Sequence, residues 1–216
     1  MFSKYLSFVD RIGEAAFAVL MVIIINGYVA LSNLNTGFLY IVVVNLGACL
    51  SWGIIDGLIY AISSSMERNL ARNKLLQLKG AANKQETTEI VKKSLDGTFL
   101  SGFTDEAKNH IAKEIVTYAP EASVGENKLL TKEELRGWLS IVGIYMAVGL
   151  LLALPFLVLP DKFLAWILSN AAGVTWVSWY GVQLGKSAGK NRWLLGTVLG
   201  LVSVVFLGLS YLVWVG

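Results

Sequence analysis

Three stretches in the second half of the chain each run for at least 23 residues without a charged side chain. They extend from Gly137 to Pro160, from Phe163 to Gly185 and from Trp193 to Gly216. A helix that crosses a hydrocarbon core of about 30 Å needs about 20 predominantly apolar residues. Each of the three stretches is therefore predicted to be a transmembrane helix.

Two further apolar stretches lie near the N-terminus, at residues 15–31 and 37–63. The first is not expected to be a signal peptide, because no small-x-small cleavage site follows it and Asp10, Arg11 and Glu14 crowd its start. The whole chain is 55% hydrophobic with a mean hydropathy of +0.61, whereas soluble domains average about 45–50% apolar residues. The sequence thus predicts an all-α membrane protein with five transmembrane helices.

Most of the charged residues lie between the second and third predicted spans. Residues 64–136 contain 12 Lys and Arg and 11 Asp and Glu residues, so this segment is almost neutral. Helical patterns recur in it, and Thr104 is an expected N-cap for the helix that follows. We therefore predict an N-terminal transmembrane pair in 1–63, a small helical subdomain in 64–136, and a three-helix transmembrane part in 137–216.

The distribution of Lys and Arg predicts the orientation in the membrane. If the N-terminus, the 64–136 segment and the turn at 186–192 lie on one side, that side holds 17 of the 18 basic residues. Only Lys162 then lies on the other side. Because cytoplasmic loops are enriched in basic residues, we expect the N-terminus and the subdomain in the cytoplasm and the C-terminus outside.

Several functional classes find no support in the sequence. The net charge of +3 is too small to suggest a nucleic-acid partner. The single cysteine, Cys49, excludes an internal disulfide and is expected to serve packing. The single histidine, His110, lies in a predicted helix, and the chain has no Ser-His-Asp set, phosphate-binding glycine loop or haem ligand pair. We expect neither an enzyme nor a tightly bound cofactor.

The second predicted span carries a polar face. Asp56 has at least ten uncharged residues on each side, and a carboxylate inside a bilayer usually faces a protein interior or a water path. Steps of three and four residues place further polar side chains on the same face. The face comprises Asn45, Cys49, Trp52, Asp56, Tyr60, Ser63 and Glu67, with Met66 beside it. It is either an ion path or an interhelical hydrogen-bond seam.

Two groups of side chains in the subdomain have the spacing of metal ligands. Glu86 and Glu89 lie on one face of a predicted helix, and Glu106, His110 and Glu114 follow one another at intervals of four on a later helix. Mn²⁺ and Fe²⁺ accept carboxylate and imidazole ligands. The alternative is an ordinary solvated surface, because Glu and Lys alternate in this region.

Small residues recur in spans four and five, and the sequence predicts close helix packing there. Gly181 and Gly185 are four residues apart, as are Gly196 and Gly200. This spacing lets membrane helices approach closely. Asn26, the polar side chain in the first span, is expected to hydrogen-bond to another helix.

Residues 11–31, 45–69 and 130–173 resemble prokaryotic members of the vacuolar iron transporter family, most specifically in the segments WGIIDGLIY and ILSN. The resemblance implies five spans, with a cytoplasmic helical subdomain between spans two and three. It also implies a multi-pass homodimer in the prokaryotic cytoplasmic membrane that exports Fe²⁺ or Mn²⁺ in exchange for protons. In the family, acidic and methionine side chains of the first two spans line the path, and glutamates of the subdomain gather metal. The matching residues here are Glu14 in span one, Asp56, Met66 and Glu67 in span two, and Glu86 and Glu89 in the subdomain.

We therefore expect a divalent-metal exporter whose partners are the lipid bilayer, the metal ion and a second copy of the chain. The expected transport path comprises Glu14, Asn45, Asp56, Tyr60, Ser63, Met66 and Glu67. The expected metal ligands are Asp56, Met66, Glu67, Glu86, Glu89, Glu106, His110 and Glu114. The alternative is a non-transporting membrane scaffold or partner-docking protein, in which the polar face is a helix-packing seam.

Overall fold

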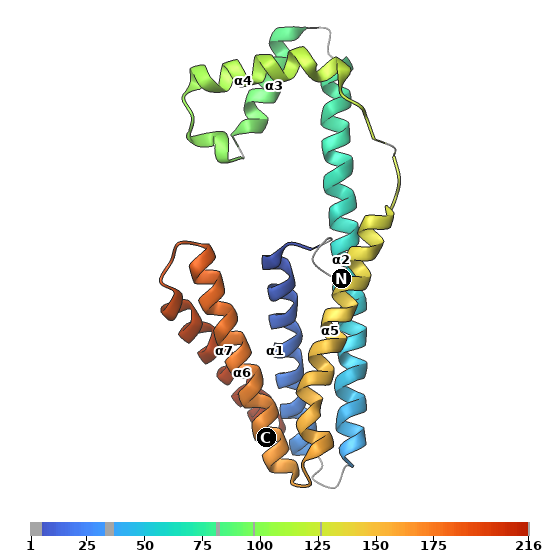
Figure 1. The fold of residues 1–216 in the computed structure, drawn as a ribbon, viewed down its shortest axis with the longest axis vertical. Coiled ribbons are helices and arrows are strands. Elements are labelled where there is room, and N and C mark those ends of the chain that lie inside the picture. Colours follow the sequence, from blue (N-terminus) through green and yellow to red (C-terminus); the bar gives the residue numbers. More distant parts are fainter. Residues whose placement is uncertain (1–5, 33–36, 81–82, 97, 126, 216) are drawn as a thin grey trace. The chain divides into compact units, whose positions relative to one another are not determined.

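The structure, a computed structural model of the 216-residue chain, is helical throughout the part that it describes (Figure 1). It describes residues 6–32, 37–80, 83–96, 98–125 and 127–215, without the side chains of residues 28–32, 38, 84, 86 and 210–215. Seven α-helices and two short 3-10 helices lie within these residues, and no β-strand does. The predicted all-α fold class is confirmed.

Each predicted span corresponds to one helix, but three of these helices extend beyond the predicted bounds: the first begins at Phe8, the second ends at Gly80 and the helix of the third span begins at Lys132. In chain order the α-helices are α1 (Phe8–Ser32), α2 (Phe38–Gly80), α3 (Lys84–Leu95), α4 (Asp105–Tyr118), α5 (Lys132–Val158), α6 (Lys162–Ser187) and α7 (Arg192–Val215). The 3-10 helices are Phe99–Gly102 and Ala119–Glu121. Thr104 caps α4 as predicted, accepting a hydrogen bond from the backbone N–H of Ala107. Asp161 caps α6 in the same way, accepting from the N–H groups of Phe163 and Leu164.

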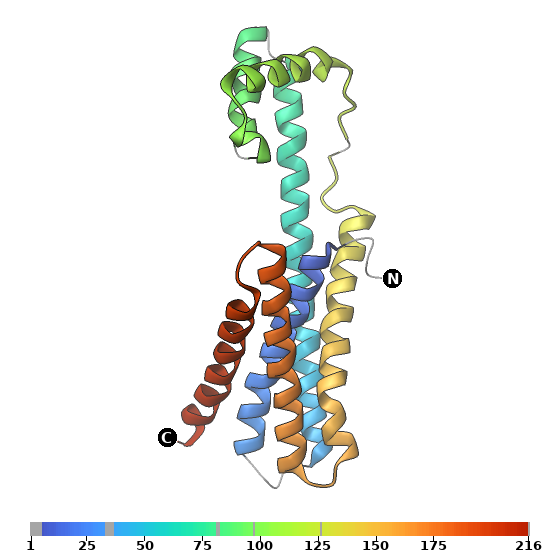
Figure 2. The same cartoon turned by 60° about the vertical axis from the view of Figure 1, so that its left-hand side comes forward.

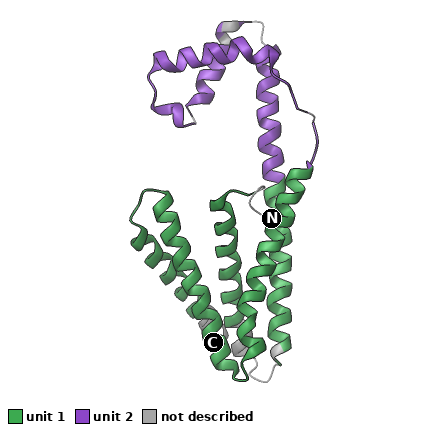
Figure 3. Cartoon of the chain, viewed as in Figure 1, with its two compact units in different colours: residues 1–61, 132–216 green, residues 62–131 purple. Residues whose placement is uncertain are grey.

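The chain divides into two compact units, which Figure 3 colours separately. Unit 1 consists of Met1–Ala61 and Lys132–Gly216, and unit 2 is Ile62–Thr131. The sequence-based division, at 63/64 and 136/137, separates the two apolar parts of the chain, whereas the structure joins them in one unit. They join because α1, from the first part, packs against α5, α6 and α7 from the second.

Three helices are long and apolar enough over the described residues to cross a membrane, namely α2, α5 and α7. The chain is therefore a membrane protein with three candidate spans in the part described. The sequence predicts α1 and α6 as spans as well, and they are 25 and 26 residues long. Helix α1 carries charged residues in its first two turns, and α6 carries Ser169 and Asn170 in its first half.

Helix α1 supplies much of the core of unit 1. Its buried residues include Val19, Val22 and Ile23, all at most 2% exposed. They belong to one apolar cluster with Tyr145 of α5 and Val177 of α6. Both ribbon views show α1 beside α5 and α6 (Figures 1 and 2). The three helices thus form a continuous interior into which side chains of α2 also point.

Glycines bring α6 and α7 into backbone contact, as their spacing predicts. A Cβ atom built on Gly181 would lie 2.6 Å from the carbonyl oxygen of Leu195 and 2.8 Å from the Cα atom of Gly196. One built on Gly185 would lie 2.6 Å from the Cα atom of Arg192. No side chain fits at these points, so the close packing of the two helices depends on the glycines.

In unit 2, α3 and α4 form a small pair of amphipathic helices. Val91 and Leu95 of α3 pack with Ala112 of α4 in a minor apolar cluster. The Nζ atom of Lys108 lies 2.8 Å from Oδ1 of Asp96, the C-cap of α3. The Lys108 side chain is only 11% exposed, whereas that of Asp96 is 57% exposed. The cation offsets the unfavourable placement of a carboxylate at a helix C-terminus.

The α6–α7 contact leads to a first prediction. Gly181→Ala should lower the free energy of unfolding by about 1–3 kcal/mol, because the added methyl group meets backbone atoms that cannot turn aside. Thermal unfolding of the purified protein in detergent measures the loss. The matched control is Gly47→Ala in α2, where a Cβ atom would have no neighbour within 4 Å. An equal loss in both variants would contradict this account of the packing.

The Asp96–Lys108 pair leads to a prediction about pH. The hydrogen bond from Lys108 and its charge lower the pKa of Asp96 below its ordinary value. The stabilisation is therefore complete above the pKa of an unfolded Asp, about 3.9, and is lost as pH falls through the lower folded-state pKa. Asp96→Asn should reduce thermal stability at pH 7 and have less effect near pH 3. The control, Asp105→Asn, removes a longer and more exposed pair with Lys92. If the loss from Asp96→Asn were the same at both pH values, the ionic pair would not be its cause.

Candidate functional site

The inward face of α2 is formed by small and polar residues. Asn45 and Cys49 are completely buried, and Gly53, Gly57 and Ala61 continue the buried line. Trp52, predicted on the same face, is 38% exposed and instead contacts Phe17 of α1 edge to face. Asp56 and Tyr60 flank the buried line and are half-buried. The predicted polar face is thus split between the interior and the border of unit 1.

Side chains of α2 and α5 alternate in size where the two helices meet. Cβ atoms built on Gly53 and Gly149 would lie 3.0 Å from Cβ of Tyr145 and 2.8 Å from Sγ of Cys49, respectively. Gly57 faces Trp138, whose indole N–H donates to the carbonyl of Ile54 (3.1 Å). Each large side chain therefore lies over a small one on the other helix. This confirms the expected packing role of Cys49.

The α2–α5 contact brings a tyrosine hydroxyl to Asp56. The O–H group of Tyr145 donates a hydrogen bond to Oδ2 of Asp56. Tyr145 is completely buried, and its ring lies against Gly53, one turn before Asp56 on α2. A buried tyrosine needs a partner for its hydroxyl group, and here the partner is a carboxylate. The buried ring thereby fixes the rotamer of a half-buried acid.

Glu14 of α1 supplies a second carboxyl group at this place. It is half-buried, and it interacts electrostatically with both Asp56 and Tyr145. Glu14 lies in the second turn of α1, near the start of the helix, as the sequence places it. The expectation that Asp56 has no charged group in reach is wrong, because Glu14 interacts with it.

Glu14 and Asp56, which we call the carboxylate pair, have the chemistry of a cation site. Each of three helices contributes one oxygen-bearing side chain, from Glu14, Asp56 and Tyr145. Hard divalent cations prefer such oxygen ligands. Two like charges in a partly desolvated interior repel each other, and either a proton or a cation relieves the repulsion.

A second set of polar side chains joins four helices of unit 1. Asn45 Nδ2 donates to Asn26 Oδ1 (2.7 Å), and Asn26 Nδ2 donates to Ser169 Oγ (2.9 Å). Ser169 in turn donates to the carbonyl of Leu152 (2.7 Å). We call Asn45, Asn26 and Ser169 the asparagine chain. The predicted interhelical role of Asn26 is confirmed, and at Asn45 the polar face serves as a packing seam.

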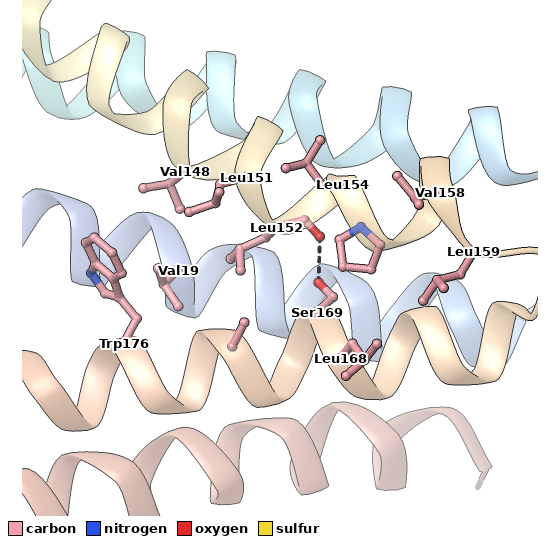
Figure 4. A pocket seen from close by; sticks show the side chains of 12 residues that line it. Val19, Val148, Leu151, Leu152, Leu154, Val158, Leu159, Leu168, Ser169 and Trp176 are labelled. Carbon is pink, nitrogen blue, oxygen red and sulfur yellow. Dashed lines mark hydrogen bonds between the residues drawn. The ribbon is translucent and has the colours of Figure 1, made fainter.

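Beside this chain lies an apolar pocket of about 470 Å³ among α1, α5 and α6 (Figure 4). Its walls include Val19, Leu152 and Trp176. Pro155 also lines it, at a position inside α5 where proline has no backbone N–H to donate to the helix. Figure 4 shows the Ser169–Leu152 hydrogen bond at its edge. No titratable side chain is among the described lining residues, so we assign no ion-binding or catalytic role to this pocket.

The remaining predicted path residues belong to unit 2. Ser63, Met66 and Glu67 are exposed there, and Met66 is 60% exposed. All three remain predicted path residues, and Met66 and Glu67 remain predicted metal ligands. Tyr60, at the edge of unit 1, packs its ring against Gly137 of α5.

The predicted ligands of the subdomain are also on the surface. Glu89, Glu106, His110 and Glu114 are exposed, and the side chain of Glu86 is outside the described part. Glu89 borders a polar pocket together with Asn109 and Lys113, which come from the adjacent α4. Within the described residues no three His, Cys, Asp or Glu side chains come together. Metal binding by these residues remains a prediction.

Sequence reasoning did not identify Tyr145. Its signal is a hydroxyl group in the middle of a long apolar run, at a position where a polar atom needs a partner. Gly53 and Gly57 gave a related signal, since they flank Asp56 and provide space for a large side chain from another helix. To pair Tyr145 with the space beside Asp56, one must know how far α5 is shifted along α2. The sequence does not give this register.

No protein-family model matches the chain, and no curated protein matches it significantly.

The asparagine chain leads to a prediction about stability. Asn26→Leu should lower the free energy of unfolding by about 1–3 kcal/mol, because it leaves the amide of Asn45 and the hydroxyl of Ser169 without their partner. The control is Asn170→Leu, since Asn170 is similarly buried but bonds only to Trp166 of its own helix. Thermal unfolding in detergent measures both variants. A larger effect at Asn170 would mean that the chain does not tie the helices together.

Proposed function

We propose that the chain is a membrane transporter that exports a divalent metal cation, Fe²⁺ or Mn²⁺, in exchange for protons. The observation that supports it most directly is the carboxylate pair inside unit 1, with Tyr145 bonded to one member. Ionisable side chains among membrane helices are costly and usually serve ion or proton pathways. Two carboxylates from different helices balance the charge of one divalent ion.

Exchange follows from competition for the same oxygen atoms. A metal ion binds the ionised carboxylates and releases their protons, and protons arriving from the other side displace the metal. Tyr145 donates to Oδ2 of Asp56 and so leaves Oδ1 for the metal or the proton. In this scheme Tyr145 is a positioning residue. The metal is cargo, and no resident cofactor takes part.

The proposal includes the membrane arrangement implied by the family resemblance. Helices α1, α2, α5, α6 and α7 are the five spans of a prokaryotic cytoplasmic membrane protein, with the N-terminus and unit 2 in the cytoplasm. A second copy completes a homodimer. Large apolar side chains exposed on α2, such as Val43, Ile55 and Ile59, support contact with lipid or with that copy. The exposed carboxylates of unit 2 are not needed for the exchange step.

The second candidate is a non-transporting membrane scaffold, and the asparagine chain favours it. That chain turns part of the polar face into a seam that holds four helices together. A seam explains the amide bonds from Asn45 to Asn26 and from Asn26 to Ser169, although Oδ1 of Asn45 has no hydrogen-bond partner among the described residues. It explains the carboxylate pair less well, because two acids that repel each other do not stabilise a helix contact.

Asp56→Asn tests the exchange directly. The variant keeps the size of the side chain and can still accept from Tyr145, but it cannot ionise. We expect folded protein without proton-driven metal flux in proteoliposomes loaded with a metal-sensitive dye. Glu14→Gln should behave in the same way. Tyr145→Phe should reduce flux roughly tenfold, as loss of an orienting partner typically does.

The matched control is Asp161→Asn, which removes a carboxylate outside the pair and retains an N-cap residue for α6. Its flux should equal that of the unchanged protein. Full, pH-dependent flux through a folded Asp56→Asn variant would exclude the exchange role. Absence of flux from the unchanged protein, with Fe²⁺ and with Mn²⁺, would favour the scaffold.

A further inference from the structure

Unit 2 contains a basic pocket of about 590 Å³ between α2 and the segment that leads to α5. Its walls include Arg68 and Arg72 of α2 and Lys128 of the returning segment, over a floor formed by Ala71 and Leu75. No acidic side chain is among its described lining residues. Three cations around one concave surface create a positive potential that favours an anion.

Hydrogen bonds hold the pocket in shape. Nη2 of Arg68 donates to the carbonyl of Lys128 (2.6 Å), and Nε of Arg72 donates to the carbonyl of Gly125 (3.0 Å). Ser65 adds a third bond, to the carbonyl of Leu129. These residues lie at steps of three and four on α2, so one helix face binds three carbonyl groups of the returning segment. The pocket is therefore built by the fold and is not a chance cluster of surface lysines.

Arg72 retains donors for a ligand. Only its Nε atom is used by Gly125, and no hydrogen bond to Nη1 or Nη2 is found among the described residues. These two terminal nitrogen atoms present a planar set of N–H groups, which matches the oxygen atoms of a phosphate group. Arg72 as a residue is half-buried.

The position on α2 identifies the source of the anion. Arg68 is the first basic residue after the long uncharged part of α2, five residues beyond Ser63. At a rise of 1.5 Å per residue it lies about 7.5 Å further along the helix axis, and Arg72 about 13.5 Å. Helical side chains lean toward the N-terminus, and here that direction leads back to the bilayer. Polar headgroups occupy a layer about 5–8 Å thick on each side of the hydrocarbon core.

We propose that this basic pocket binds the phosphate group of an anionic lipid headgroup. Arg72 supplies two terminal nitrogen atoms that no described residue engages, and Arg68 and Lys128 lie beside it in the pocket lining. The shared chemistry is a phosphate group, for which a soluble phosphate ester is the other source. A lipid bound here links α2 to the returning segment within unit 2. This role is independent of metal transport.

The test measures binding of short-chain phosphatidylglycerol to the purified full chain by thermal stabilisation in a zwitterionic detergent. Short-chain phosphatidylcholine and glycerol 3-phosphate are the comparison ligands. Phosphatidylglycerol should stabilise the protein, and phosphatidylcholine should not. Stabilisation by glycerol 3-phosphate at equal concentration would support the phosphate site and assign it to a soluble ligand. No stabilisation by either phosphate compound would overturn the proposal.

Ala71→Glu places a carboxylate on the floor of the pocket without removing any of the three carbonyl bonds. It should weaken phosphatidylglycerol binding roughly tenfold or more, whereas its neutral counterpart Ala71→Gln should bind within about twofold of the unchanged protein. Unchanged binding by Ala71→Glu would overturn the proposal. This pair keeps the test valid if changes at the arginines disturb the fold.

A second pair separates a built site from general attraction of basic residues to anionic lipid. Arg72→Gln should weaken binding about fivefold. Lys74→Gln removes the same charge two residues along α2, from an exposed side chain outside the pocket, and should have little effect. Equal losses in the two variants would show a delocalised surface charge and contradict the site.

Discussion

The close contact between α2 and α5 determines which polar side chains of unit 1 can find partners. Gly53 and Gly57 on α2, and Gly137 and Gly149 on α5, each lie under a larger side chain of the other helix. This fixes the register of the two helices, since a shift of one residue would bring large side chains together. The register in turn carries the hydroxyl of Tyr145 to Asp56. In a membrane, where water cannot satisfy buried polar groups, such a match decides whether the fold is viable.

Two kinds of polar contact result, and they differ in charge. The asparagine chain links neutral amide and hydroxyl groups, so its hydrogen bonds need no change of protonation or of bound ion. The carboxylate pair brings together groups that repel each other when both are ionised. Tyr145 satisfies one oxygen atom of Asp56 and leaves the repulsion in place. The asparagine chain therefore fits a structural role. The carboxylate pair fits a site that binds and releases protons or a cation.

Much of the fold follows from local sequence. The existence of the helices, the N-cap at Thr104 and the close glycine packing of α6 and α7 depend on residues close together in the chain, and the structure confirms them. The interhelical bond of Asn26 was also predicted, because a lone amide in an apolar helix has few other options. The meeting of Glu14, Asp56 and Tyr145 could not be predicted in this way. It depends on how far α1, α2 and α5 are shifted along one another. Residues far apart in the sequence determine these shifts.

If the carboxylate pair acts as proposed, its two acidic groups determine the charge of the transported metal ion. In a medium of low dielectric constant two carboxylates that interact with each other are most stable when one or two protons or one divalent cation neutralise them. A monovalent metal ion would leave one negative charge, whereas a divalent ion leaves none. Protons and a divalent metal can thus alternate at the pair, and the empty, doubly charged form is the costly state between them. The high free energy of the empty state couples proton movement to metal movement, because the pair releases a metal ion most readily when protons replace it, and the reverse.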